Sequence, residues 1–93
     1  AGICAAASAL AGTGILNSVA HTGNALASHQ KYGGYDGATL YRDQPQAVSD
    51  QGVVTAPGNS PVSFAKEVLN ALGLWGPEAE AELSVFSAEH VPI

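Results

Sequence analysis

Positive charge is almost absent from this sequence. Its 93 residues hold 3 lysines and arginines against 8 aspartates and glutamates, which gives a formal net charge of −5. The cations Lys31, Arg42 and Lys66 are scattered along the chain rather than clustered. A phosphate backbone is bound by a cluster of basic side chains, so the composition excludes nucleic acid as a partner.

Large core-forming side chains are also scarce. The sequence has no methionine, one tryptophan and two phenylalanines, and alanine supplies much of its 46% hydrophobic content. Alanine gains little free energy on burial, because each buried methylene contributes only about 0.8 kcal/mol. We therefore predict that residues 1–93 form a single small domain or an assembly subunit, stabilised further by a partner surface.

Cysteine occurs once, as Cys4. A single cysteine excludes an intrachain disulfide and a cysteine-based zinc site. The neighbours Ile3 and Ala5 offer no positive charge that would favour a thiolate. The sequence therefore predicts that Cys4 is a small buried hydrophobe rather than a reactive thiol.

Residues 1–30 contain no Asp, Glu, Lys or Arg. Apolar residues recur at helical spacing, which predicts helices over 3–11 and 14–28, with their continuity through Gly12 and Gly14 left open. Small residues four apart favour close packing of this uncharged helical segment against another chain. The interface candidates on it are Ile3, Leu10, Leu16, Val19 and Leu26.

Two histidines, His21 and His29, are the only titratable side chains in residues 1–30 besides Cys4. If this segment is buried in an assembly, desolvation disfavours their charged forms. The sequence therefore marks His21 and His29 as pH-sensitive candidates.

The remaining chain divides into two parts by composition. Residues 31–60 are rich in turn-forming residues and predict a loop region, with short strands over 38–42 and 52–55 that could form a hairpin. Residues 61–93 predict a helical pair: Ser60 is a candidate N-cap, Pro61 and Pro77 suit helix starts, and Gly73 suits a helix stop. The fold class expected is mainly α.

Motifs for catalysis or cofactors are not evident. The glycines at 12 and 14 are not preceded by the strand that a dinucleotide fingerprint needs. Of the histidines His21, His29 and His90, the first two could share a helix face, but no third metal ligand lies nearby in a tight motif, and no Gly-x-Ser-x-Gly elbow occurs. We predict no catalytic, cofactor-binding or metal-binding residues and no enzyme, since a chain this short rarely closes a pocket.

The sequence thus predicts a non-catalytic structural subunit of a filament, capsid or heteromeric complex. Its partner would be a second copy or another protein chain, contacted through the uncharged N-terminal helix. The alternative is a membrane-active secreted or viral protein, such as a toxin or lytic subunit, because residues 1–30 are compositionally similar to viral fusion and lytic peptides. A small enzyme ranks third. Both leading hypotheses favour an extracellular or virion setting.

Overall fold

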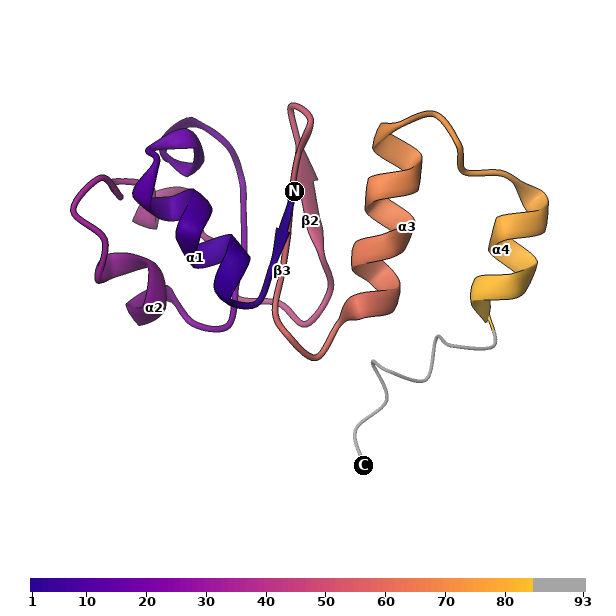
Figure 1. The fold of residues 1–93 in the computed structure, drawn as a ribbon, viewed down its shortest axis with the longest axis horizontal. Helices are drawn as coiled ribbons and strands as arrows, with labels where there is room; N and C mark the ends of the chain where they lie inside the picture. Colours follow the sequence, from indigo (N-terminus) through magenta and orange to yellow (C-terminus); the bar gives the residue numbers. More distant parts are fainter. Residues whose placement is uncertain (85–93) are drawn as a thin grey trace.

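The computed structural model describes residues 1–84, and a small sheet lies at its centre (Figure 1). The strands are β1 (Gly2–Ile3), β2 (Val48–Asp50) and β3 (Val53–Ala56), in the order β1-β3-β2. Strand β1 runs parallel to β3, whereas β2 runs antiparallel to it. The sheet is therefore mixed, and β1 brings the start of the chain beside β3, which follows more than fifty residues later.

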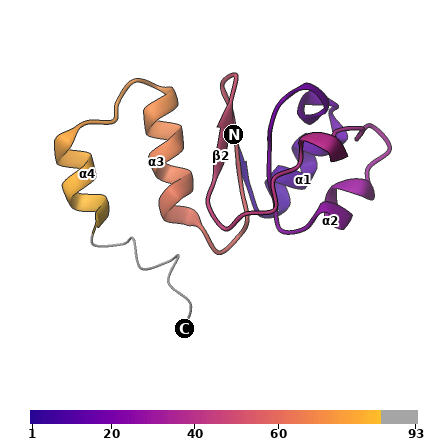
Figure 2. The same cartoon turned by 180° about the vertical axis from the view of Figure 1, so that it is seen from behind.

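Helices cover both faces of this sheet (Figures 1 and 2). Helix α1 (Ala5–Gly12) and the short helix α2 (Leu26–Gln30) lie on one side. Helix α3 (Pro61–Ala71) covers the other side, and α4 (Pro77–Ser84) lies beyond α3. Two 3-10 turns, η1 (Ile15–Ser18) and η2 (Ala38–Leu40), complete the α1 side.

The hairpin between β2 and β3 is the most local element of the fold. Gln51 and Gly52 form its two-residue turn, with φ angles of 50° and 79°. Positive φ at both central residues is the geometry that matches the twist of the flanking strands. The hairpin gives β3 a partner on one edge, and β1 pairs with the other edge.

The core consists of one apolar cluster on each face of the sheet. The cluster on the α1 side contains Ala11, Leu16 and Val19, and the cluster on the α3 side contains Ala47, Val54 and Ala56. Adjacent strand residues point to opposite faces. Accordingly, Val53 packs on the first cluster and Val54 on the second.

The C-terminal helices begin and end close to the predicted positions. After α3, Gly73 has φ 73°, its N–H bonds Asn70 O at 3.0 Å, and Leu74 N–H bonds Leu69 O at 2.8 Å. This pair of bonds is a Schellman ending, which glycine supports at low cost. Ser60 does not cap α3 with its side chain; its hydroxyl donates to the carbonyl of Pro45 instead.

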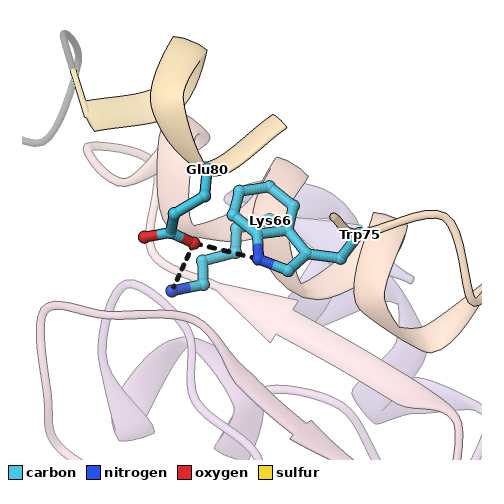
Figure 3. A network of polar contacts seen from close by, with 3 residues as sticks. All are labelled: Lys66, Trp75 and Glu80. Carbon is cyan, nitrogen blue, oxygen red and sulfur yellow. Dashed lines mark hydrogen bonds and ion pairs between the residues drawn. The ribbon is translucent and has the colours of Figure 1, made fainter. Parts of the chain in front are cut away.

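A small polar network holds α4 beside α3 (Figure 3). Glu80 Oε2 accepts a hydrogen bond from Trp75 Nε1 at 2.9 Å and lies 3.8 Å from Lys66 Nζ. The ammonium of Lys66 also lies 5.4 Å from the centroid of the Trp75 ring. Because Lys66 and Glu80 are substantially exposed, their ion pair contributes no more than about 1 kcal/mol. The predicted helical pair extended into residues 85–93, which, with His90, lie outside the described residues.

The expectation of a mainly α chain is wrong, since a sheet forms the centre of the fold. The predicted helix over 14–28 is interrupted: Val19 is extended, and His21 forms a bridge with Tyr41. The segment from 19 to 25 makes long-range backbone contacts, which outweigh its helical spacing. The predicted strand over 38–42 is largely the 3-10 turn η2. Within residues 1–84, no helix is both long and apolar enough to cross a membrane.

Candidate active site

Cys4 stands at a sharp turn between β1 and α1. Its backbone has φ 59° and ψ −124°, a region that residues with a Cβ rarely adopt. Hydrogen bonds hold the turn on both sides: Cys4 N–H donates to Ala56 O at 3.0 Å, and Ala7 N–H donates to Cys4 O at 3.1 Å. The thiol is free and exposed, so the prediction of a buried Cys4 is wrong. Strained backbone of this kind is concentrated at functional sites.

Small residues on both sides make this turn feasible. A Cβ at Gly2 would lie 2.8 Å from the backbone carbon of Ala6, so only glycine fits where the strand passes the helix. The run Gly2-Ile3-Cys4-Ala5-Ala6 has the form of the Gly-x-Ser-x-Gly nucleophile elbow, with cysteine as the nucleophile and alanine at the last position. A motif with serine at its centre does not match this run, whereas the same motif with cysteine in place of serine does, apart from its last position.

Asn24 is the polar partner of the thiol. Its Nδ2 lies 3.3 Å from Cys4 Sγ and donates to it, while its Oδ1 accepts from Gly58 N–H at 2.7 Å. Gly58 belongs to the loop after β3, and a Cβ there would lie 2.9 Å from Sγ. Three separate segments therefore converge on the sulfur. Within residues 1–84, Asn24 is the one side chain that hydrogen-bonds to Sγ.

The N-terminal end of α1 adds backbone donors beside the thiol. The first turn of a helix leaves its N–H groups without intrahelical partners, and these groups together with the helix dipole favour negative charge. Helix α1 begins at Ala5 and carries no acidic side chain in its first turn. The N–H of Ala5, the residue after Cys4, belongs to this first turn.

Two hollows flank Asn24. One, of about 240 Å³, is lined by residues that include Ala5, Asn24 and Lys31. The other, of about 260 Å³, is lined by residues that include Asn24, Tyr41 and Asp43. Ala5, which follows Cys4 in the chain, and Asn24, which donates to its sulfur, both line the first hollow, whereas Cys4 itself does not. Lys31 lines the first hollow and Asp43 lines the second, so their charged side chains have opposite signs.

Beneath the site lies a cluster of four rings, which we call the ring cluster: His21, His29, Tyr35 and Tyr41. The centroids of each His–Tyr pair lie 5.4–5.8 Å apart, and every such pair is edge-on. His21 Nδ1 donates to Val19 O at 2.8 Å, because a carbonyl can only accept, and its Nε2 lies 2.8 Å from the Tyr35 hydroxyl. Both histidines are fully buried.

Burial shifts three pKa values in the ring cluster. Desolvation lowers the pKa of His21; the hydrogen bond to Val19 O opposes this, and unfavourable electrostatic interactions with His29 and Arg42 add to the lowering. Desolvation raises the pKa of Tyr35 and of Tyr41, and the nearby side chain of Thr22 partly offsets the rise at Tyr41. Among residues 1–84, no group of three His, Cys, Asp or Glu side chains could hold a metal ion.

The predicted interface residues lie mostly inside the chain. Leu16 and Val19 are buried in the α1-side core, and Leu10 packs against it. Ile3 packs against the α3-side core, and Leu26 is half-buried in the first turn of α2. Intrachain packing accounts for their burial, and any contact of these residues with a second chain stays a prediction.

Comparison with known proteins places this geometry in context, although no family model matches the chain. A solved DJ-1 superfamily protein from Agrobacterium tumefaciens is 73% identical, with a TM-score of 0.92 over 96% of this chain and 47% of its own. A ThiJ/PfpI family structure from Bacillus anthracis is 34% identical, with a TM-score of 0.81 over 91% of this chain and 41% of its own. The fold is that of the DJ-1/ThiJ/PfpI superfamily.

Two curated relatives from Bacillus subtilis (strain 168) carry a catalytic name. The uncharacterized protease YoaZ is 44% identical over 79 residues, which are 84% of this chain and 37% of YoaZ. The uncharacterized protease YdeA is 36% identical over 78 residues, which are 84% of this chain and 39% of YdeA. The chain thus spans about two fifths of the length of these DJ-1-type relatives.

These findings overturn the predicted function. The relatives indicate a catalytic, protease-like family, so the prediction of a non-catalytic assembly subunit is wrong, and so is the prediction that the chain is no enzyme. The structural, self-assembling and secreted or membrane-active characters have no support. The small residues of the N-terminal segment, which predicted close packing against another chain, instead let a strand, a turn and a helix pack closely within one chain.

Proposed function

We propose that this chain supplies the nucleophile of a cysteine-dependent acyl hydrolase of the DJ-1 type, and that Cys4 is that nucleophile. The observation that carries the proposal is the exposed thiol at φ 59° on a strand-to-helix turn. The protease names of two relatives support an amide as the scissile bond. Because the chain covers less than half of each relative, the whole protein contributes further groups.

The proposed chemistry is acyl transfer through a thioester. Cys4 Sγ, as thiolate, attacks the carbonyl carbon of the substrate; the carbon–sulfur bond forms and the carbonyl oxygen becomes an oxyanion. The oxyanion then re-forms the carbonyl, the carbon–nitrogen bond breaks, and the amine leaves with a proton taken from solvent or from the group that accepted the thiol proton. Water hydrolyses the thioester, which releases a carboxylic acid and restores the thiol.

Each neighbour of the sulfur has a role in this sequence. The Asn24 amide donates to Sγ and favours the thiolate, since a hydrogen bond to the charged form stabilises that form. The Ala5 N–H donates to the oxyanion. The hollow beside Ala5 and Asn24 accommodates the substrate. Within residues 1–84 no His, Asp or Glu side chain hydrogen-bonds to Sγ, so the proton of the thiol passes to solvent or to a group outside this range.

The test compares Cys4→Ser with wild type for hydrolysis of a fluorogenic casein substrate. We expect the variant to lose about a thousandfold or more of the activity, because removing a nucleophile costs factors of this order. Ser49→Ala, an exposed position on the strand of the sheet farthest from β1, is the control and retains full activity. Iodoacetamide adds one carbamidomethyl group to wild type and none to Cys4→Ser, because Cys4 is the sole cysteine. Hydrolysis by Cys4→Ser at more than half the wild-type rate contradicts the proposal.

A further inference from the structure

The segment from Thr22 to Asn24 is held by its backbone. Thr22 N–H donates to Thr55 Oγ1 at 2.9 Å, which fixes the segment to β3. His29 Nε2 lies 3.1 Å from Thr22 O, and the hydroxyl of Tyr41 donates to Gly23 O at 3.1 Å. The carbonyls of Thr22 and Gly23, the two residues before Asn24, therefore accept hydrogen bonds from side chains elsewhere in the fold.

His29 is itself fixed on both ring nitrogens. Because a carbonyl only accepts, Nε2 carries the hydrogen shared with Thr22 O, and Nδ1 pairs with the hydroxyl of Ser8 on α1 at 3.1 Å. The ring is fully buried. A Cβ at Gly23 would lie 2.5 Å from His29 Cε1, so the ring packs directly on the backbone of the segment. The histidine thus joins the helix that follows Cys4 to the segment that carries Asn24.

Asn24, in contrast, is exposed. Among the described residues, its side chain hydrogen-bonds to Cys4 Sγ and Gly58 N–H and to no other group. An exposed side chain keeps one geometry only if its backbone is fixed. We propose that His29 and Tyr41 are positioning residues, which hold the carbonyls of Thr22 and Gly23 so that the Asn24 amide reaches the thiol. This inference rests on the proposed role of Cys4 as the nucleophile.

The ring cluster contains a matched pair of tyrosines for testing this inference. Tyr41 and Tyr35 both lie edge-on to both histidines and both are half-buried. The Tyr41 hydroxyl bonds Gly23 O, whereas the Tyr35 hydroxyl bonds His21 Nε2. Tyr41→Phe and Tyr35→Phe therefore remove the same atom from similar environments, but only the first removes a bond to the segment from Thr22 to Asn24.

The experiment measures the rate of alkylation of Cys4 by iodoacetamide as a function of pH, in the folded protein. Asn24→Ala sets the full effect: we expect an alkylation rate near neutral pH about fivefold lower, the factor given by one net hydrogen bond. Tyr41→Phe and His29→Gln should lower the alkylation rate by about twofold to fivefold. Tyr35→Phe should match wild type.

A general loss of stability does not produce this pattern, since it would affect both tyrosine variants. Wild-type profiles in Tyr41→Phe and His29→Gln overturn the inference, as does an equal shift in Tyr35→Phe. An unchanged profile in Asn24→Ala also overturns it, because there would then be nothing to position. Should fully buried His29 not tolerate glutamine, Tyr41→Phe alone decides. The thiol profile is independent of turnover, so failure of the proposed hydrolase activity is recognised separately, in Cys4→Ser.

Discussion

The backbone strain at Cys4 can be tested by exchanging its side chain. At φ 59° and ψ −124°, any residue with a Cβ is strained, whereas glycine is not. Such a conformation costs about 1–3 kcal/mol. We therefore expect Cys4→Gly to be more stable than Cys4→Ala, although glycine ordinarily destabilises a folded chain.

The magnitude follows from two opposing contributions. Both variants lose the contact between Asn24 Nδ2 and the sulfur, so that loss cancels in the comparison. Glycine relieves the strain but raises the conformational entropy of the unfolded chain, which offsets about 0.4–1 kcal/mol of the gain. The free energy of unfolding of Cys4→Gly should therefore exceed that of Cys4→Ala by roughly 0.5–2 kcal/mol.

Urea denaturation of both variants at neutral pH measures this difference directly, provided that their denaturant slopes agree. Ala9→Gly is the control, because Ala9 is an exposed residue within α1 and its replacement should destabilise the protein by about 0.5–1 kcal/mol. The two alanine-to-glycine comparisons thus have opposite signs. A Cys4→Gly variant that is no more stable than Cys4→Ala would refute the strain argument and, with it, the main physical sign of a functional turn.

Three further predictions concern other parts of the fold. The pKa of His21 lies below its value in the unfolded chain, so the stability that His21 contributes is complete above about pH 6.5 and declines as the pH falls below it. The urea midpoint of wild type should therefore drop between about pH 7.5 and pH 5.5, and the midpoint of His21→Gln should drop less. Gly73→Ala should lower the free energy of unfolding by about 1 kcal/mol, because Gly73 has φ 73°, and an unchanged midpoint would contradict the Schellman ending. Glu80→Gln should change stability by less than about 0.5 kcal/mol, since its ion pair with Lys66 is exposed, while Glu80→Ala should alter Trp75 fluorescence by removing the acceptor of its indole N–H.

The parts of the fold that the sequence predicts are those with local causes. Pro61, Gly73 and Pro77 mark the ends of α3 and α4 because the conformational restrictions of proline and glycine act within one turn. These residues need no partner elsewhere in the chain. The predicted strand over 52–55 largely matches β3, but Gly52 lies in the turn before it, and its hairpin partner is β2, which was not predicted.

The parts that it missed depend on distant partners. Strand β1 is two residues long and exists through its pairing with β3, more than fifty residues away. The segment from 19 to 25 has helical spacing, yet Thr22 bonds Thr55 and His21 pairs with Tyr41, and these contacts hold it extended. Periodicity reports only which face of an element is apolar, so it could not show either pairing.

The candidate site divides in the same way. The turn at Cys4 has a local signal, a glycine two residues before the cysteine and an alanine two residues after it, which reflects the close approach of strand and helix. The role of Asn24 has no such signal, because it depends on how residues 20 positions apart meet in space. A search that allowed cysteine in the nucleophile elbow would have found the first residue and not the second.

The absence of Asp, Glu, Lys and Arg from residues 1–30 predicted a non-catalytic segment, yet the structure places uncharged polar groups of this segment around the thiol. The groups around Sγ and beneath it are backbone N–H groups, an amide, hydroxyls and imidazoles. Fixed neutral donors can stabilise a thiolate and an oxyanion without a charged side chain, because they are oriented before the reaction begins. An ionised carboxylate or ammonium in the same buried network would cost several kcal/mol in desolvation. A segment without charged side chains is therefore compatible with nucleophilic chemistry, provided that its polar groups are held in place as those of Thr22, Gly23 and His29 are.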